Sequence, residues 1–142
     1  MKKEKFIIGK SDKANFPDFN LKDVKVKIDT GAYTSTIHCS EIWEENNELK
    51  VIFLSDQHLQ YTGEIITFKE YSLKKVRSSS GQSQLRYKVK GTITLFGKIF
   101  NTEFTLSRRD KMKYPVLLGR KLLNNNFLVD TSKKNLSHSQ TH

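Results

Sequence analysis

The sequence is poor in cysteine and in long apolar runs. Cys39 is the only cysteine among 142 residues, which excludes an internal disulfide bond. The N-terminal stretch MKKEKFIIGKSD carries basic residues, but its apolar run is far too short for a signal peptide. No segment approaches the roughly 20 apolar residues that a membrane-spanning helix needs. These absences predict a cytoplasmic protein without a membrane partner.

Acidic residues are also scarce relative to basic ones. There are 15 Asp and Glu residues against 25 Lys and Arg residues, which gives a net charge of +10. Such a balance favours an acidic partner, which could be nucleic acid, an anionic membrane surface or a carboxylate-rich substrate. Charge alone does not choose among these three classes.

The chain length is that of one domain. With 142 residues the chain can bury a hydrophobic core without support from disulfide bonds. The last segment, TSKKNLSHSQTH, is polar and lacks periodicity. We therefore expect a single domain over residues 1–130 and a disordered tail over residues 131–142.

Alternation of apolar and polar residues dominates the sequence and predicts a mainly β fold. Residues 24–28 (VKVKI) are typical of a half-buried strand, and this strand leads into Asp29. Helix is expected over residues 120–126, for about two turns, and is also considered for residues 41–50. Further strands are predicted at residues 49–55, 64–77, 84–107 (a pair joined near Gly97), 114–119 and 127–130, with a hairpin tip at residues 77–84.

Asp29 begins an Asp-Thr-Gly sequence at the end of the strand over residues 24–28. When two such turns meet, their carboxyl groups lie a few ångströms apart and share one proton, because both cannot be ionised. The ionised carboxylate then takes a proton from water, and the water attacks a peptide carbonyl. Gly31 allows the two backbones to approach closely, and the Thr30 hydroxyl can hydrogen-bond between the two turns.

The chain has one Asp-Thr-Gly sequence, so the second carboxyl group must come from another molecule. A peptidase of this kind is therefore predicted to be a homodimer with one Asp29 in each chain. Asp110 and Asp130 are weaker candidates within the chain, because neither is followed by Thr-Gly. An ordinary Asx turn after a strand is the alternative interpretation of the tripeptide.

Several motifs occur in an order that is typical of one peptidase family. They are KIDTGAYTSTIH (27–38), VRSSSG (76–81) followed by Arg86, TLSRRDKMKYPVLLGR (105–120) and LVD (128–130). Together they resemble the RimB-like family of retropepsin-like aspartic peptidases, whose members are often labelled ATP-dependent zinc proteases. The resemblance covers residues 21–130.

The resemblance implies a fold and an activity. The fold is a small closed β-barrel of the acid protease type with one short C-terminal helix. Asp29 is then the catalytic acid, and Thr30 and Gly31 complete its turn. Members of the family are associated with ATP-grasp ligases that add glutamate tails to a ribosomal protein. The implied activity is the trimming of such poly-glutamate tails, with the tailed ribosomal protein as a partner.

Neither zinc nor ATP is expected as a cofactor, despite the label that family members often carry. The sequence has no HExxH motif, no cysteine pair and no glycine-rich phosphate loop. An aspartic dyad needs no cofactor, so none is predicted.

Five cationic residues are predicted to bind an acidic substrate. Lys27 lies on the polar face of its strand directly before Asp29, and the four arginines match the pattern of the family. No acid follows the catalytic turn in the segment AYTS, so the last of these arginines is expected to be free to bind a substrate carboxylate. For each cation the alternative is a solvated surface charge. The predicted set is Lys27, Arg77, Arg86, Arg109 and Arg120.

A non-enzymatic basic β-barrel that binds RNA or a ribosomal surface is the rival function. The net charge fits both functions. The residue that discriminates between them is Asp29, because Asp29→Asn should abolish hydrolysis and leave binding by a basic surface intact. Binding to RNA should also show a steep dependence on salt.

Overall fold

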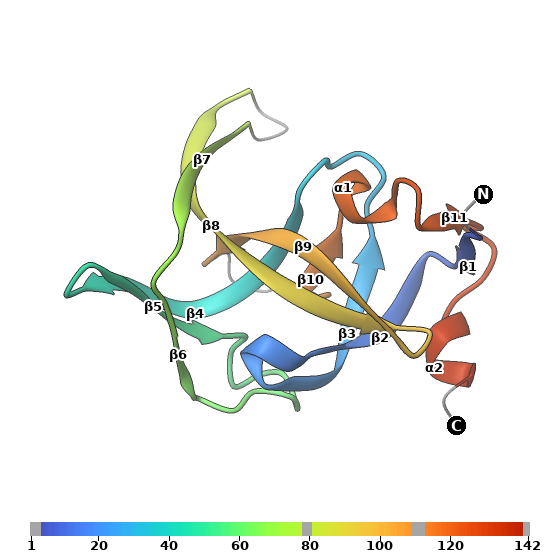
Figure 1. The fold of residues 1–142 in the computed structure, drawn as a ribbon, viewed down its shortest axis with the longest axis horizontal. Helices are drawn as coiled ribbons and strands as arrows, with labels where there is room; N and C mark the ends of the chain where they lie inside the picture. The colour runs from blue at the N-terminus through green and yellow to red at the C-terminus, as the bar shows by residue number, and fades with distance from the viewer. Residues whose placement is uncertain (1–3, 78–80, 109–112, 141–142) are drawn as a thin grey trace.

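The chain folds mainly into β-strands, as the alternating pattern predicts (Figure 1). The structure is a computed structural model that describes residues 4–77, 81–108 and 113–140. Its strands are β1 (Phe6–Ile8), β2 (Ser11–Phe16), β3 (Leu21–Ile28), β4 (Ser35–Glu45), β5 (Glu48–Phe53), β6 (Ile65–Phe68), β7 (Ser72–Arg77), β8 (Ser83–Leu95), β9 (Lys98–Ser107), β10 (Val116–Leu118) and β11 (Phe127–Val129). A 3-10 turn, η1 (Pro17–Phe19), and two short helices, α1 (Arg120–Leu123) and α2 (Leu136–Gln140), complete the described elements.

Strand β10 connects the end of β3 to the start of β4 within the sheet. Its strand order is β10-β3-β2-β8-β9-β4-β5-β6, with β7 paired to β8. Strand β10 runs parallel to β3 and antiparallel to β4, so it lies between them. Six strands therefore pair in a circuit, although a single residue pair, Asn15 with Thr94, joins β2 to β8. We describe the domain as mainly β, and barrel closure stays a prediction.

Strand β3 follows the predicted alternation. Val24, Val26 and Ile28 are buried, while Lys25 and Lys27 are exposed on the opposite face. A side chain of this kind contributes roughly 1.5–3 kcal/mol when it is fully buried. The buried face thus fixes the register of the strand, and with it the position of the residue that follows Ile28.

Aromatic side chains fill much of the core behind this strand. Phe16, Phe19 and Phe104 are almost completely buried, and the Phe19 ring stacks on Phe53 with centroids 4.3 Å apart. Edge-to-face contacts join Phe104 to both Phe16 and Phe19. This packing holds η1, β2, β5 and β9 together and provides a rigid base for the β3 end.

The helix considered for residues 41–50 is absent, because this segment forms the hairpin of β4 and β5. Asn46 and Asn47 connect the strands with φ angles of 53° and 60°. Asn tolerates this left-handed conformation, and two such residues form the tight turn that antiparallel strands favour. Helix α1 is also shorter than the predicted two turns. It ends at Leu123, and Asn125 has a φ of 67°, which does not continue a helix.

The disordered tail predicted for residues 131–142 is wrong for residues 131–140. Helix α2 begins at Leu136, and the almost completely buried carboxylate of Asp12 accepts hydrogen bonds from the backbone N–H groups of Ser137 (2.9 Å) and His138 (3.1 Å). The Ser137 hydroxyl accepts a third bond from the Phe96 N–H. A buried carboxylate needs such donors, which explains why a polar segment is ordered here. Residues 141–142 lie outside the described residues.

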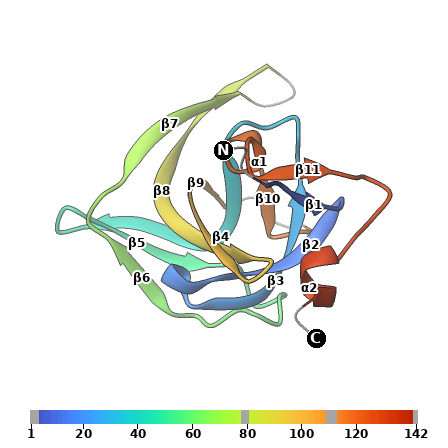
Figure 2. The ribbon, with the colours of Figure 1, turned by 45° about the vertical axis from the view of Figure 1, so that its right-hand side comes forward.

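Figure 2 shows β7 and β8 as a long, curved hairpin at the upper left of the domain. Strands β1 and β11 form a separate parallel pair near the chain ends. No helix in the described part of the chain has the length and apolar character needed to cross a bilayer.

Candidate active site

Asp29 lies at the end of β3 in a turn that its own side chain stabilises. The Gly31 N–H donates to Asp29 Oδ1 at 3.1 Å, and the Ala32 N–H donates to the Asp29 carbonyl at 3.2 Å. The Asp29 N–H donates in turn to the Leu118 carbonyl at 2.9 Å. The carboxyl group is half-buried, whereas Thr30 and Gly31 are exposed. The turn therefore presents its carboxyl group at the surface in a fixed orientation.

The start of α1 holds this turn from the other side. The N–H groups of Arg120 and Lys121 donate to the carbonyls of Ala32 (2.9 Å) and Tyr33 (2.8 Å). The Gly119 N–H donates to the Oγ of Ser35, whose side chain is fully buried. Residues 29–35, which we call the Asp29 loop, are thus bonded to β10 and α1 by backbone groups, and this fixes the position of the carboxyl group.

Arg120 contacts the Asp29 loop through a backbone carbonyl, and its predicted binding to a substrate carboxylate stays a prediction. Its Nη1 donates to the Thr30 carbonyl at 2.8 Å, and its guanidinium lies 5.8 Å from the centre of the Tyr33 ring. A guanidinium has five N–H donors, so this contact occupies only part of its capacity. Arg120 can therefore hold the loop and still offer donors to a carboxylate.

Lys74 and Tyr33 join the site although sequence reasoning did not select them. The Nζ of Lys74 donates to the Thr34 hydroxyl and also lies 5.7 Å from the centre of the Tyr33 ring. Lys74 is on β7, and its cross-strand partner on β8 is Arg86. The β7–β8 hairpin therefore touches the Asp29 loop, and half-exposed Tyr33 contacts cations from two segments. No local pattern distinguishes Lys74 from the lysine that follows it.

The other predicted cations occupy different positions. Lys27 is exposed on β3, beside Ser11 of β2 and Leu117 of β10. Arg77 is exposed at the end of β7. Arg86 is half-buried on β8, and its Nε donates to Gln84 Oε1 at 3.4 Å. Arg109 lies outside the described residues.

Asp130, one of the two alternative acids within the chain, is bonded to a neighbouring residue. Asp130 follows β11, and its carboxylate accepts bonds from the N–H and hydroxyl of Ser132. These hydrogen bonds hold the pKa of Asp130 below its ordinary value, so it stays ionised. Asp110 lies outside the described residues. Asp29 thus remains the acid with the Thr-Gly context.

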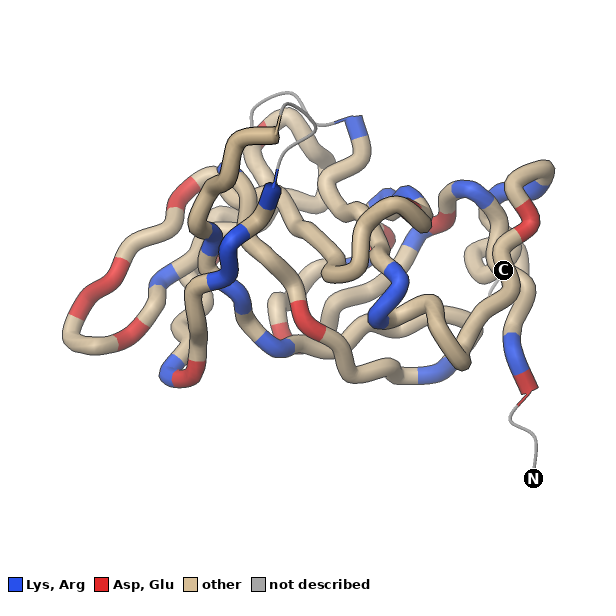
Figure 3. Tube along the Cα trace, turned by 90° about the horizontal axis from the view of Figure 1, so that it is seen from above, with Lys and Arg blue, Asp and Glu red and all other residues tan. Residues whose placement is uncertain are grey.

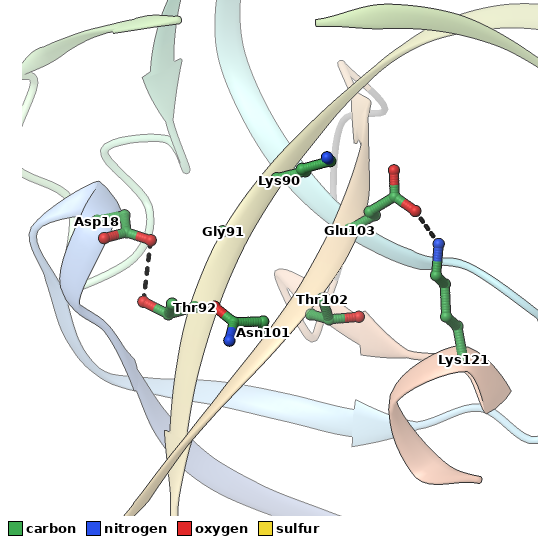
Figure 4. A pocket seen from close by; sticks show the side chains of 8 residues that line it. All are labelled: Asp18, Lys90, Gly91, Thr92, Asn101, Thr102, Glu103 and Lys121. Carbon is green, nitrogen blue, oxygen red and sulfur yellow. Dashed lines mark hydrogen bonds and ion pairs between the residues drawn. The ribbon is translucent and has the colours of Figure 1, made fainter. Parts of the chain in front are cut away.

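One broad cavity is lined by none of the residues of the Asp29 loop. It measures about 540 Å³ and is formed mainly by β8 and β9 (Figure 4). Within it Lys121 contacts Glu103, and Asp18 accepts a bond from the Thr92 hydroxyl at 2.9 Å. None of the predicted site residues lines it. Within the described residues, no three His, Cys, Asp or Glu side chains gather as a metal site would require.

Curated proteins named probable alpha-L-glutamate ligase are similar to this chain. The protein of Shewanella pealeana is 35% identical over 137 residues, which cover 94% of this chain and 30% of that protein. The protein of Desulfotalea psychrophila is 29% identical over 130 residues, which cover 89% of this chain and 28% of that protein. The chain therefore spans about 30% of the length of these relatives.

A solved structure has a similar fold. The crystal structure of Lpg0085 from Legionella pneumophila, described as a protein with unknown function (DUF785), matches with a TM-score of 0.73 and 26% identity. The match covers 94% of this chain and 99% of that one. The mainly β architecture is thus shared along nearly the whole length of both chains.

A family model described as "Retropepsin-like aspartic endopeptidase RimB" matches residues 7–140. This range contains the Asp29 loop, the β7–β8 hairpin and the segment from β10 to α1 that holds the loop in place. It also includes α2, which the motifs in the sequence did not reach. The chain therefore belongs to the RimB-like family of retropepsin-like aspartic endopeptidases.

Proposed function

We propose that this chain forms a homodimeric aspartic peptidase that hydrolyses poly-glutamate or similarly acidic peptide chains in the cytoplasm. The observation that carries the proposal is the geometry of Asp29. Its carboxyl group lies at the end of a strand, in a turn bonded to β10 and α1, with exposed Thr30 and Gly31 next to it. Such a turn can meet its copy from a second chain without prior rearrangement.

In the proposed dimer the two Asp29 carboxyl groups share one proton. The ionised carboxylate takes a proton from a water molecule, and the water oxygen forms a bond to the peptide carbonyl carbon. The protonated carboxyl group supports the developing oxyanion, and a proton passes to the leaving amine as the C–N bond breaks. Exposed Thr30 is available for a hydrogen bond to the second turn, and the barrel closed by β10 would complete an acid protease fold.

The charge around the Asp29 loop supports an acidic substrate. Arg120 and Lys74 contact the loop directly, and Lys27 is exposed two residues before Asp29. Each glutamate in a poly-glutamate chain carries one negative charge, so these cations can bind its side chains and steer its approach. We further propose that Arg77, Arg86 and Arg109 bind the parts of the chain that lie farther from Asp29.

The names of the relatives point to the same substrate. A segment related to this chain accounts for about 30% of proteins named probable alpha-L-glutamate ligase. An enzyme that adds glutamate and a peptidase domain that removes it would act on the same polymer. We therefore propose a glutamate-tailed protein as the partner, with a ribosomal protein as the first candidate.

The test compares peptides with and without a glutamate tail. The wild-type protein is expected to shorten the tailed peptide only, as measured by mass spectrometry, and Asp29→Asn is expected to cut neither. Asn has nearly the same size as Asp and cannot act as a base, so loss of activity in a folded variant assigns the chemistry to this carboxyl group. If wild-type protein cuts neither peptide but retains RNA in a salt-dependent manner, the peptidase proposal is wrong and RNA binding replaces it.

The same variant tests whether each active site needs two chains. When equal amounts of wild-type and Asp29→Asn chains exchange subunits at random, about a quarter of the dimers carry two intact carboxyl groups. Activity should therefore fall to about one quarter of that of the same total concentration of wild-type protein. A fall to one half would show that each chain acts alone.

A further inference from the structure

We propose that a lysine-lined cavity beside β3 is a second binding site for the acidic chain, separate from the Asp29 loop. Lysines from four segments line this cavity, which measures about 190 Å³. Lys13 is on β2, Lys25 is on β3, Lys113 precedes β10 and Lys134 precedes α2. None of these lysines belongs to the predicted set of substrate-binding cations. We call this feature the lysine cavity.

The lysine cavity holds four positive charges that form no ion pairs within the described residues. Lys13 and Lys25 stand directly opposite each other on paired strands, an arrangement that is unfavourable for like charges. No ion pair between described residues includes any of the four lysines. This differs from the cavity in Figure 4, where Lys121 contacts Glu103. An anion from outside the chain would therefore relieve the repulsion.

The one acid that lines the lysine cavity, Asp12, can offset only one of its four positive charges. Asp12 is 2% exposed, and its two oxygens already accept hydrogen bonds from the N–H groups of Lys13, Ser137 and His138. These bonds direct the carboxylate toward the backbone at the start of α2. The positive field also reaches beyond the cavity, because Lys25 is among the groups that lower the pKa of His58, after burial and His38.

The position of the lysine cavity points to a peptide chain of carboxylates. Lys25 and Lys27 lie on the same face of β3, which leads directly into Asp29. Lys25 precedes Asp29 by four residues, or about 13–14 Å of strand, and an extended peptide needs about four residues for that distance. A glutamate chain bound at Asp29 could therefore reach the lysine cavity with a segment about four residues away.

The choice of a carboxylate chain over another polyanion rests on the proposed function. Figure 3 shows that blue segments occur over much of the chain, whereas several acidic residues gather on the β4–β5 hairpin. The lysine cavity is thus distinguished by converging, unpaired lysines and by its strand link to Asp29 rather than by basic character alone. Its expected role is to favour long glutamate chains over short ones.

The experiment measures the binding of labelled oligo-glutamates to the Asp29→Asn protein, so that hydrolysis does not interfere. Chains of about four and about twelve residues are compared by fluorescence anisotropy at low salt. The pair Lys25→Gln and Lys134→Gln, added to this protein, is expected to weaken binding of the long chain by roughly 2- to 30-fold, as the loss of two exposed ion pairs predicts. Binding of the short chain should change by less than twofold.

The matched control removes two lysines that do not line the cavity. Lys69→Gln with Lys90→Gln changes the net charge by the same amount, and both positions are exposed. The control should leave the ratio of the two affinities unchanged, with circular dichroism used to verify the fold of each variant. If the cavity variant and the control variant bind the long chain equally, the proposal of a second binding site is wrong. Tighter binding of an RNA with the same number of charges would assign the cavity to nucleic acid instead.

Failure of the second site and failure of the proposed function remain distinguishable. Hydrolysis of both chain lengths by the wild-type protein, with no effect of the cavity variant on long-chain affinity, would leave the peptidase standing and remove the second site. Absence of hydrolysis, with the predicted loss of long-chain affinity, would remove the peptidase and leave a site that binds acidic peptides.

Discussion

Gly119→Ala tests whether close packing of α1 against the Asp29 loop positions the catalytic carboxyl group. Gly119 has a φ of −97° and a ψ of 177°, which alanine adopts without strain. In open space the substitution would therefore stabilise the fold by about 0.4–1 kcal/mol, because alanine restricts the unfolded chain. In this structure the substitution is instead expected to destabilise the fold, because an added Cβ would lie 2.6 Å from the Tyr33 carbonyl oxygen and 3.0 Å from that of Ala32.

Both neighbours of this Cβ are backbone atoms and cannot rotate away. The same two carbonyls accept the N–H groups of Lys121 and Arg120, so relief of the clash stretches these hydrogen bonds. Overpacking of this kind costs about 1–3 kcal/mol. We expect Gly119→Ala to lower the free energy of unfolding by that amount and to displace the Asp29 loop.

Urea unfolding followed by fluorescence measures the first effect, because Trp43 is the only tryptophan. The midpoint should fall while the slope with urea stays constant. Gly91→Ala is the matched control, since its added Cβ would lie 2.5 Å from the Phe19 ring in the core, away from the loop. Both variants should lose stability, but only Gly119→Ala should lose activity per folded molecule. A Gly119→Ala protein as stable as wild type would refute the reasoning.

The contact of Lys74 with Thr34 and the lowered pKa of His58 lead to two further predictions. Lys74→Gln removes a cation that donates to the Thr34 hydroxyl. We therefore expect faster amide exchange in β7 and a KM for glutamate chains that is raised by up to about fivefold. The same changes in Lys75→Gln would contradict a specific role for Lys74. Burial, followed by His38 and Lys25, lowers the pKa of His58 in the folded state. The unfolded chain therefore binds the proton more readily, and stability should decline as the pH falls below about 6.5. His58→Gln should flatten this decline in urea titrations at several pH values, and an unchanged slope would show that another group is responsible.

The parts of the fold that depend on local pattern could be predicted from the sequence. The alternation in residues 24–28 predicted β3 and the position of Asp29 at its end. The pair β8 and β9 was predicted with its turn near Gly97, whose φ of 71° favours glycine. In each case the residues that determine the structure are neighbours in the chain, so their periodicity carries the information.

The errors concern segments whose structure depends on distant residues. Helix α2 looked like a disordered tail because its stabilising partner, Asp12, is 125 residues away from Ser137. The helix considered for residues 41–50 does not form, because the two Asn residues adopt the left-handed conformation of a tight turn between two strands. Lys74 could not be selected since its contact with Thr34 spans 40 residues.

Arg120 shows that the backbone can position an arginine for which the sequence offers no acidic partner. The prediction considered only side-chain carboxylates as partners, and none follows the catalytic turn in the segment AYTS. The structure supplies a backbone carbonyl, that of Thr30, which every residue type possesses and no sequence pattern reveals. This contact orients the guanidinium without neutralising it. The cation that contacts the Asp29 loop is therefore available to a substrate carboxylate, whereas an ion pair with an acid would have offset its charge.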